Sequence, residues 1–136
     1  MIEITAEPIS PEVIIDRVKA DESGCIVCYV GLIRETSRNR KVASVEYFDS
    51  DGKASSRLED IADETRRKWQ LNGIALCHRT GKLQVGDINL VIAISSGHRK
   101  EGFAACQYVI DRFKEKLPTD KKEAYADGSI YTEYRK

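Results

Sequence analysis

The chain has 136 residues, and its 22 lysines and arginines balance its 22 aspartates and glutamates. This length suits a single domain, expected over residues 1–136, with a modest core. The balanced charge argues against a general nucleic-acid or membrane-surface binder. The sequence has neither a long apolar run for a membrane span nor an N-terminal basic-then-apolar signal. We therefore expect a cytoplasmic protein that binds no nucleic acid and no membrane.

The first third of the chain predicts three strands and one helix. Alternating and apolar runs predict the strands at 2–6, 24–33 and 42–48, and the helix is expected at 11–19. Ser10 suits the N-cap of this helix and Pro11 its first position. The unbroken apolar run at 24–33 predicts a strand buried on both faces, and a basic loop from Arg34 to Lys41 follows it.

The middle of the chain predicts an amphipathic helix and two strands. The helix is expected at 53–69, with one apolar face; its members are Leu58, Ile61, Ala62, Thr65 and Trp69. Strands are expected at 74–80 and 87–95, the second with Ile88, Leu90, Ile92 and Ile94 on its inner face. The glycine-punctuated segment at 81–87 predicts a small subdomain or hairpin between them.

A long helix dominates the last third of the chain. We expect it at 99–117, closed by Pro118; its apolar stripe would be Phe103, Cys106, Ile110, Phe113 and Leu117. A lysine-rich loop and a final strand at 129–135 would follow. Helices that pack on a mixed or antiparallel sheet define the α+β class.

The four cysteines are interpreted as reduced thiols in the core. Three lie in apolar strand-like runs and Cys106 lies in the long helix. Cys25 and Cys28 form a C-x-x-C pattern, and zinc binding or a redox role is the alternative. Residues three apart on a strand point to opposite faces, which is poor geometry for a shared metal or a disulfide. We therefore expect no metal site.

His98 and Arg99 open the long helix and are candidates for anion binding. A solvent-exposed first turn is the simpler interpretation. However, a cation there opposes the helix dipole unless an anion offsets it. A guanidinium offers two parallel hydrogen bonds to phosphate, and an imidazole can donate in either protonation state.

Lysines gather at the end of the same helix and just after it, at Lys114, Lys116, Lys121 and Lys122. Lysines in a last turn complement the helix dipole and need no other role. Lys114 lies about three turns after Phe103, beside the apolar stripe. Partial loss of hydration there would lower its pKa and make it a usable acid or base.

Arg34 directly follows a predicted strand, which would hold it in place, whereas the rest of the basic loop is more simply solvent-exposed. His78 ends another strand and is more simply a core or edge residue. Arg99 and Lys114 lie fifteen residues apart on one helix, or roughly 22 Å. They either serve different sites or meet across a symmetric dimer in one composite site.

Four segments together carry a resemblance to a known family. They are V-G-L-I-R, C-H-R-T-G-K-L with V-G-D, S-S-G-H-R-K-E-G-F and K-E-K-L-P-T-D-K-K-E-A. In this order and spacing the chain resembles the large, catalytic subunits of molybdopterin synthase over nearly its whole length. The resemblance implies an α/β hammerhead fold, a homodimer of large subunits and no cofactor. It also implies a small ubiquitin-like partner whose C-terminal Gly-Gly tail carries a thiocarboxylate.

The reaction that the resemblance implies moves two sulfurs from such tails onto cyclic pyranopterin monophosphate, which forms the dithiolene of molybdopterin. The family's two active-site lysines match Lys114 and Lys121. The matching substrate-binding positions are Arg34, His98, Arg99, Lys122 and Glu123. The resemblance also implies that the His-Arg pair comes from the neighbouring subunit.

One departure from the family pattern supports an alternative function. Asp120 stands where the family usually has an aromatic residue, and an acid there could pair with Lys121 and raise its pKa. The alternative is a non-catalytic module of the same fold that binds a ubiquitin-like tail or a phosphate ligand. A phosphate or RNA binder that uses the basic loop is a further possibility.

Overall fold

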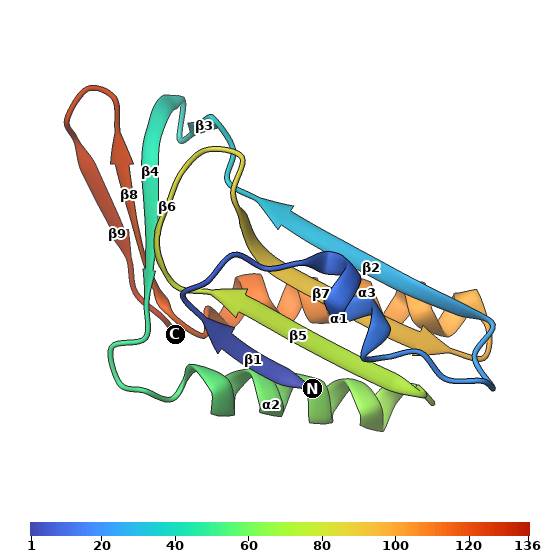
Figure 1. The fold of residues 1–136 in the computed structure, drawn as a ribbon. Helices are drawn as coiled ribbons and strands as arrows, with labels where there is room; N and C mark the ends of the chain where they lie inside the picture. Colours follow the sequence, from blue (N-terminus) through green and yellow to red (C-terminus); the bar gives the residue numbers. More distant parts are fainter.

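The computed structural model describes all residues from Met1 to Lys136, which form two β-sheets and three helices (Figure 1). The larger sheet has the order β1-β5-β7-β2. Its strands are β1 (Ile2–Thr5), β5 (Gly73–Arg79), β7 (Ile88–Ser96) and β2 (Cys25–Leu32). Only β1 and β5 pair in parallel, so this sheet is mixed.

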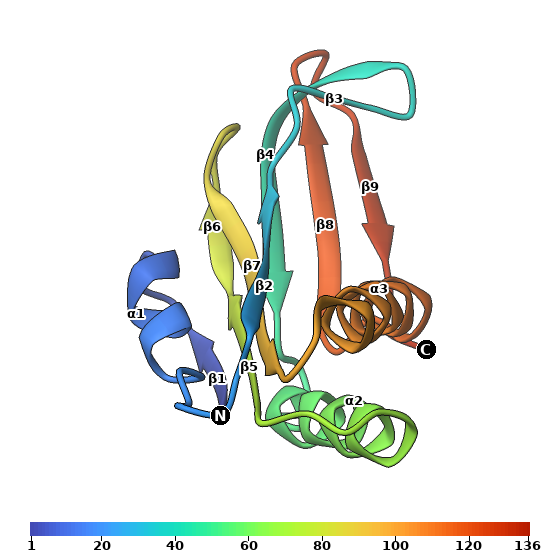
Figure 2. The same ribbon diagram turned by 90° about the vertical axis from the view of Figure 1, so that its right-hand side faces the viewer.

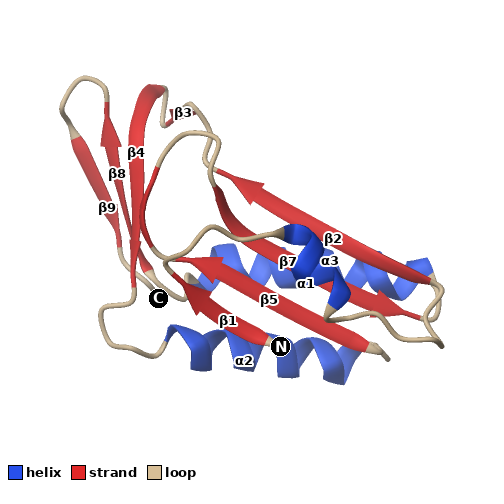
Figure 3. Ribbon diagram, viewed as in Figure 1, coloured by secondary structure: helices blue, strands red, loops and turns tan.

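The second sheet is antiparallel throughout and lies at one end of the first (Figure 3). Its strands are β3 (Thr36–Ser37), β4 (Arg40–Phe48), β8 (Asp120–Tyr125), β9 (Ile130–Glu133) and β6 (Gly81–Leu83). Strand β6 pairs with β4, which confirms that the 81–87 segment is an excursion between two strands of the main sheet. The α+β class with a mixed sheet is confirmed.

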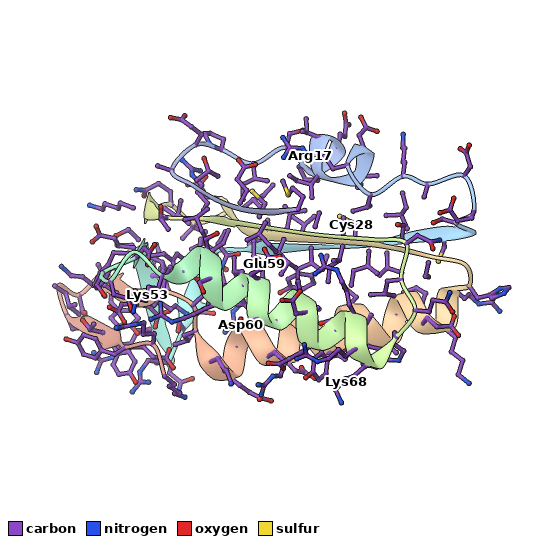
Figure 4. The ribbon with its side chains drawn as sticks, turned by 90° about the horizontal axis from the view of Figure 1, so that it is seen from below. Arg17, Cys28, Lys53, Glu59, Asp60 and Lys68 are labelled. Carbon is purple, nitrogen blue, oxygen red and sulfur yellow. The ribbon has the colours of Figure 1, made fainter.

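Helices cover both faces of the larger sheet (Figure 2). The short α1 (Pro11–Asp16) packs on one face, and α2 (Ala54–Lys68) and α3 (Arg99–Lys116) pack side by side on the other. Figure 4 views the α2 side, with Lys53 and Lys68 near the two ends of that helix. Each face has its own apolar cluster. None of the helices is long and apolar enough to cross a membrane.

Helix α3 spans nearly the predicted range, and most of its predicted stripe faces the core: Cys106, Phe113 and Leu117 are buried and Ile110 is partly buried. The residues that face the core are Gly102, Ala105, Cys106, Val109 and Phe113. The prediction for Phe103 is wrong, because its side chain is 61% exposed. A Cβ at Gly102 would lie 2.9 Å from the Ser96 Oγ and 3.1 Å from the Val27 Cγ2. The missing side chain therefore sets how closely α3 approaches the sheet.

The predicted lysine-rich loop after Pro118 is largely a strand, β8, paired with β4 on one side and β9 on the other. The prediction failed because D-K-K-E contains residues that are depleted in strands. Strand pairing to segments far away in the sequence overrides that local preference. The short strand β3 likewise lies within the predicted basic loop.

Two further predictions need correction. Helix α1 ends at Asp16, not near Lys19. Strand β2 is not buried on both faces, because it forms an edge of the larger sheet and leaves Val30 and Leu32 37% and 56% exposed. The cysteines are all free; Cys77 and Cys106 are buried in the core, as predicted, whereas Cys25 and Cys28 are only partly buried.

Candidate active site

A pocket of about 520 Å³ lies where the two sheets meet the C-terminal end of α3. Its lining comes from β2 and the segment after it, from β4 and β7, and from the end of α3 together with β8. The lining residues are Tyr29, Val30, Gly31, Leu32, Ile33, Arg34, Thr36, Ser37, Val45, Tyr47, Asn89, Leu90, Phe113, Lys114, Leu117, Lys121 and Glu123.

Four of the predicted site residues converge on this pocket: Arg34, Lys114, Lys121 and Glu123. They are the only charged residues in its lining, so three cations face one carboxylate. The pocket therefore suits an anionic ligand. No group of three or more His, Cys, Asp or Glu side chains is placed to hold a metal ion.

The alternation of β8 decides which of its charged residues reach the pocket. Lys121 and Glu123 both line it, whereas Lys122, between them, does not. The Lys121 Nζ lies 3.8 Å from Glu123 Oε2. Oε1 of Glu123 accepts hydrogen bonds from the Ser37 hydroxyl at 3.1 Å and the Tyr125 hydroxyl at 2.8 Å. Glu123 is thus held from two sides and orients Lys121. Substrate binding by Lys122 stays a prediction.

The short turn between Lys114 and Lys121 is fixed at several points. Arg57 Nη1 donates to the Pro118 carbonyl over 3.1 Å, and Leu117 has a φ of 44°. A left-handed backbone is strained for leucine and persists only when its surroundings enforce it. Such a rigid connection sets the spacing of the two lysines.

His78 fixes the same turn from inside the core, which confirms the prediction that it is a core residue. It is fully buried, and its Nδ1 lies 2.8 Å from the Asn89 carbonyl oxygen. A carbonyl can only accept, so Nδ1 carries the proton and Nε2 accepts from the Thr119 hydroxyl at 2.9 Å. Burial lowers the pKa of His78 to about 4, so its ring is neutral at pH 7.

Asp120 does not pair with Lys121, contrary to expectation. Its carboxylate is buried and accepts hydrogen bonds from the Ser50 hydroxyl and the Arg135 backbone N–H, each at 2.8 Å. Burial by itself would raise the pKa of Asp120, but these hydrogen bonds and the Arg135 guanidinium lower it below its usual value. Neighbouring residues on a strand point to opposite faces. The Asp120 carboxylate therefore binds the C-terminal segment and does not contact Lys121 in the pocket.

His98 and Arg99 lie at the far end of α3 and do not line the pocket. His98 is the N-cap of the helix, and both side chains are exposed. Phe103, one turn further along, is exposed as well. The structure therefore separates these residues from Lys114 within one chain, as the length of the helix predicts.

The sequence did not single out Asn89 and Tyr47, which also line the pocket. Asn89 Nδ2 donates to the Tyr47 hydroxyl over 2.8 Å. The available signal was the asparagine itself, a polar residue between Ile88 and Leu90 at the start of a largely apolar strand.

The fold and the pocket define an α+β protein with a cationic site built where two sheets meet one end of a long helix. The family model described as MoaE protein matches residues 4–116. The chain therefore belongs to the MoaE family, which confirms the resemblance inferred from the sequence.

Curated and solved relatives agree with this assignment. The molybdopterin synthase catalytic subunit of Bacillus subtilis is 38% identical over 126 residues, which cover 93% of this chain and 80% of that protein. The crystal structure of molybdopterin synthase from Staphylococcus aureus matches with a TM-score of 0.88 at 35% identity and covers 96% of this chain and 94% of that one. The predicted fold is confirmed by this match.

A more distant structure shares the fold alone. It is described as a complex of subunits 1 and 2 of the molybdopterin-converting factor from Helicobacter pylori. It matches with a TM-score of 0.71 at 15% identity and covers 98% of this chain and 88% of that one.

Proposed function

We propose that the chain is the catalytic subunit of a molybdopterin synthase and acts in molybdenum cofactor biosynthesis. It transfers sulfur from the C-terminal thiocarboxylate of a small ubiquitin-like subunit to cyclic pyranopterin monophosphate. The observation that carries the proposal is the convergence of Arg34, Lys114 and Lys121 in one pocket. Both the thiocarboxylate and the phosphorylated substrate are anions, and the pocket offers them three cations.

The roles of the two lysines follow from their positions. Lys114 is exposed at the end of α3, where its ammonium can polarise the thiocarboxylate carbonyl or move a proton as sulfur attacks the substrate. Lys121 is held beside Glu123 and stabilises negative charge that develops during transfer. Arg34 binds the substrate through its guanidinium. The sulfur arrives on the partner, so the reaction needs no cysteine of this chain.

His98 and Arg99 complete the site from a second copy of the chain in a homodimer. The length of α3 and the exposure of both residues support this arrangement. Phe103, exposed one turn after Arg99, gives that end of α3 an apolar side chain for such a contact. We also propose that the protein is cytoplasmic, where free thiols such as Cys77 and Cys106 are the usual state.

The test is the variant Lys114→Ala, assayed for molybdopterin with a thiocarboxylated small subunit. We expect product formation to fall at least about a hundredfold, the typical contribution of a proton-transferring or charge-stabilising group. Lys116→Ala is the matched control, because Lys116 lies in the same helical turn but does not line the pocket. Turnover by Lys114→Ala at the rate of Lys116→Ala would contradict the assigned role.

The alternative of a non-catalytic module rested on Asp120. Because the Asp120 carboxylate is bound by Ser50 and Arg135, it does not neutralise Lys121. Binding of the thiocarboxylated subunit without any product from the unmodified chain would support that alternative.

A further inference from the structure

Asn89 and Tyr47 line the pocket as a pair in which each residue has an unused hydrogen-bonding atom. The Asn89 Nδ2 donates to Tyr47 Oη. The Asn89 Oδ1 is buried, and no group of the chain donates to it. The Tyr47 phenol accepts from Asn89, and its own proton has no acceptor in the chain. The pair thus presents one acceptor and one donor.

An unpaired buried acceptor costs free energy, so the unused Oδ1 calls for an explanation. A ligand that enters the pocket and donates to this oxygen would remove the cost. Both residues line the pocket that contains Lys114 and Lys121, so a ligand there can reach them.

A β-bulge places Asn89 at this position. Gly31 of β2 pairs with Leu90, but the next residue, Leu32, pairs with Ile88, which leaves Asn89 as an extra residue on β7. The bulge also moves Ile88 to the α1 side of the sheet, whereas Leu90 packs on the α2 and α3 side. The predicted common inner face for Ile88 and Leu90 is therefore wrong. Bulges often redirect a side chain toward a functional site.

Gly31 lets β2 pass close to the unpaired oxygen. A Cβ on residue 31 would lie only 2.7 Å from Asn89 Oδ1. Any larger residue here would displace the Asn89 side chain, so glycine keeps the amide in its position at the pocket. The lining residues Val45 and Leu90 are apolar, so the pocket suits a bound chain without polar side chains.

The donor and acceptor of the pair match one residue of an extended chain, whose N–H and C=O point to the same side of the backbone. Tyr47 remains protonated at neutral pH, since burial raises its pKa to about 12. Its hydroxyl can therefore donate to a carbonyl while Asn89 Oδ1 accepts from an amide N–H. A tail of glycines would present these groups with no side chain to obstruct them.

We infer that Asn89 and Tyr47 bind the backbone N–H and C=O of one residue in the partner's C-terminal tail and so set how far the tail enters the pocket. This inference rests on the proposed function, because it assumes that such a tail occupies the pocket. It assigns recognition of the tail backbone to Asn89 and Tyr47. Binding of the anionic groups remains with Arg34, Lys114 and Lys121.

The test uses a small ubiquitin-like subunit joined by ligation to a synthetic C-terminal segment. In each version one amide N–H of the tail is replaced by an ester oxygen, which removes a single donor. We expect one ester position to weaken binding to the unmodified chain about tenfold, the effect of losing one hydrogen bond to a buried acceptor. That ester should cause no further loss with Asn89→Leu, in which the acceptor is already absent.

Two further variants keep the test decisive if Asn89→Leu folds poorly. Tyr47→Phe retains the ring that contacts His78 and loses only the hydroxyl, so we expect weaker tail binding with normal folding. Asn72→Leu is the matched control, since Asn72 is exposed and lies outside this pocket. Affinity for the pterin substrate alone should be the same in all of these proteins.

The possible outcomes separate this inference from the proposed function. Binding that responds equally to every ester, in the unmodified chain and in Asn89→Leu, would overturn the inference and leave the function standing. Loss of pterin affinity with unchanged tail affinity would also overturn it and would assign the pair to the substrate. No binding of the unmodified partner at all would overturn the proposed function and the inference together.

Discussion

Two inactive variants of this protein should restore activity when they are combined. We expect Arg99→Ala and Lys114→Ala each to lose molybdopterin formation as homodimers. In a composite site, Arg99 of one chain serves the pocket that contains Lys114 of the other. A mixed dimer then has one site with both residues intact and one site that lacks both.

The magnitude follows from the geometry of α3. The helix runs from Arg99 to Lys116, and Arg99 and Lys114 are roughly 22 Å apart along it, at 1.5 Å per residue. Both residues of one chain cannot contact one small substrate. If equal amounts of the variants exchange subunits at random, about half of the dimers are mixed, and about a quarter of all sites are intact. Recovered activity should therefore approach about a quarter of that of the unmodified protein.

The assay mixes the variants under conditions that allow subunit exchange and follows product formation over time. A double variant, Arg99→Ala with Lys114→Ala, mixed with unmodified chain is the matched control. Its mixed dimers carry the same two substitutions, but both lie on one chain, so neither site has both residues. Activity of this control should fall during exchange from about a half to about a quarter of that of the unmodified protein. If the two single variants stay inactive after complete exchange, the residues act within one chain or at separate sites, and the composite site is wrong.

Two predictions concern the stability that His78 and Asp120 give to the segment between Lys114 and Lys121. His78 has a pKa of about 4 in the folded chain, against about 6.5 when unfolded, so the unfolded state binds more protons between these values. Stability should be complete above pH 6.5 and fall by about 3 kcal/mol as the pH drops to 4. Urea titrations at pH 6.5 and pH 4 should show that His78→Asn lacks this pH-dependent loss of unfolding free energy. An equal loss in the variant and the unmodified protein would contradict a neutral buried ring. Asp120→Asn should lower stability by about 1–2 kcal/mol and leave the pH profile of sulfur transfer unchanged, whereas a shifted profile would mean that the carboxylate acts on Lys121.

Local patterns in the sequence determined much of this protein. The bounds of α2 and α3 follow from apolar periodicity and from Pro118, because a helix is specified by residues a few positions apart. The separation of Arg99 from Lys114 follows in the same way, since helical rise converts sequence distance into length. The family resemblance rests on four short segments in a fixed order, and these too are read directly from the sequence.

The features that depend on pairing between distant segments were decided only by the tertiary structure. Strand β8 forms from a charged segment because β4 and β9 supply its hydrogen bonds. This pairing turns Asp120 away from the pocket and Lys121 toward it. The bulge that directs Asn89 into the pocket likewise exists only in the register between β2 and β7. Register joins residues far apart in the chain, so no local pattern in the sequence could reveal it.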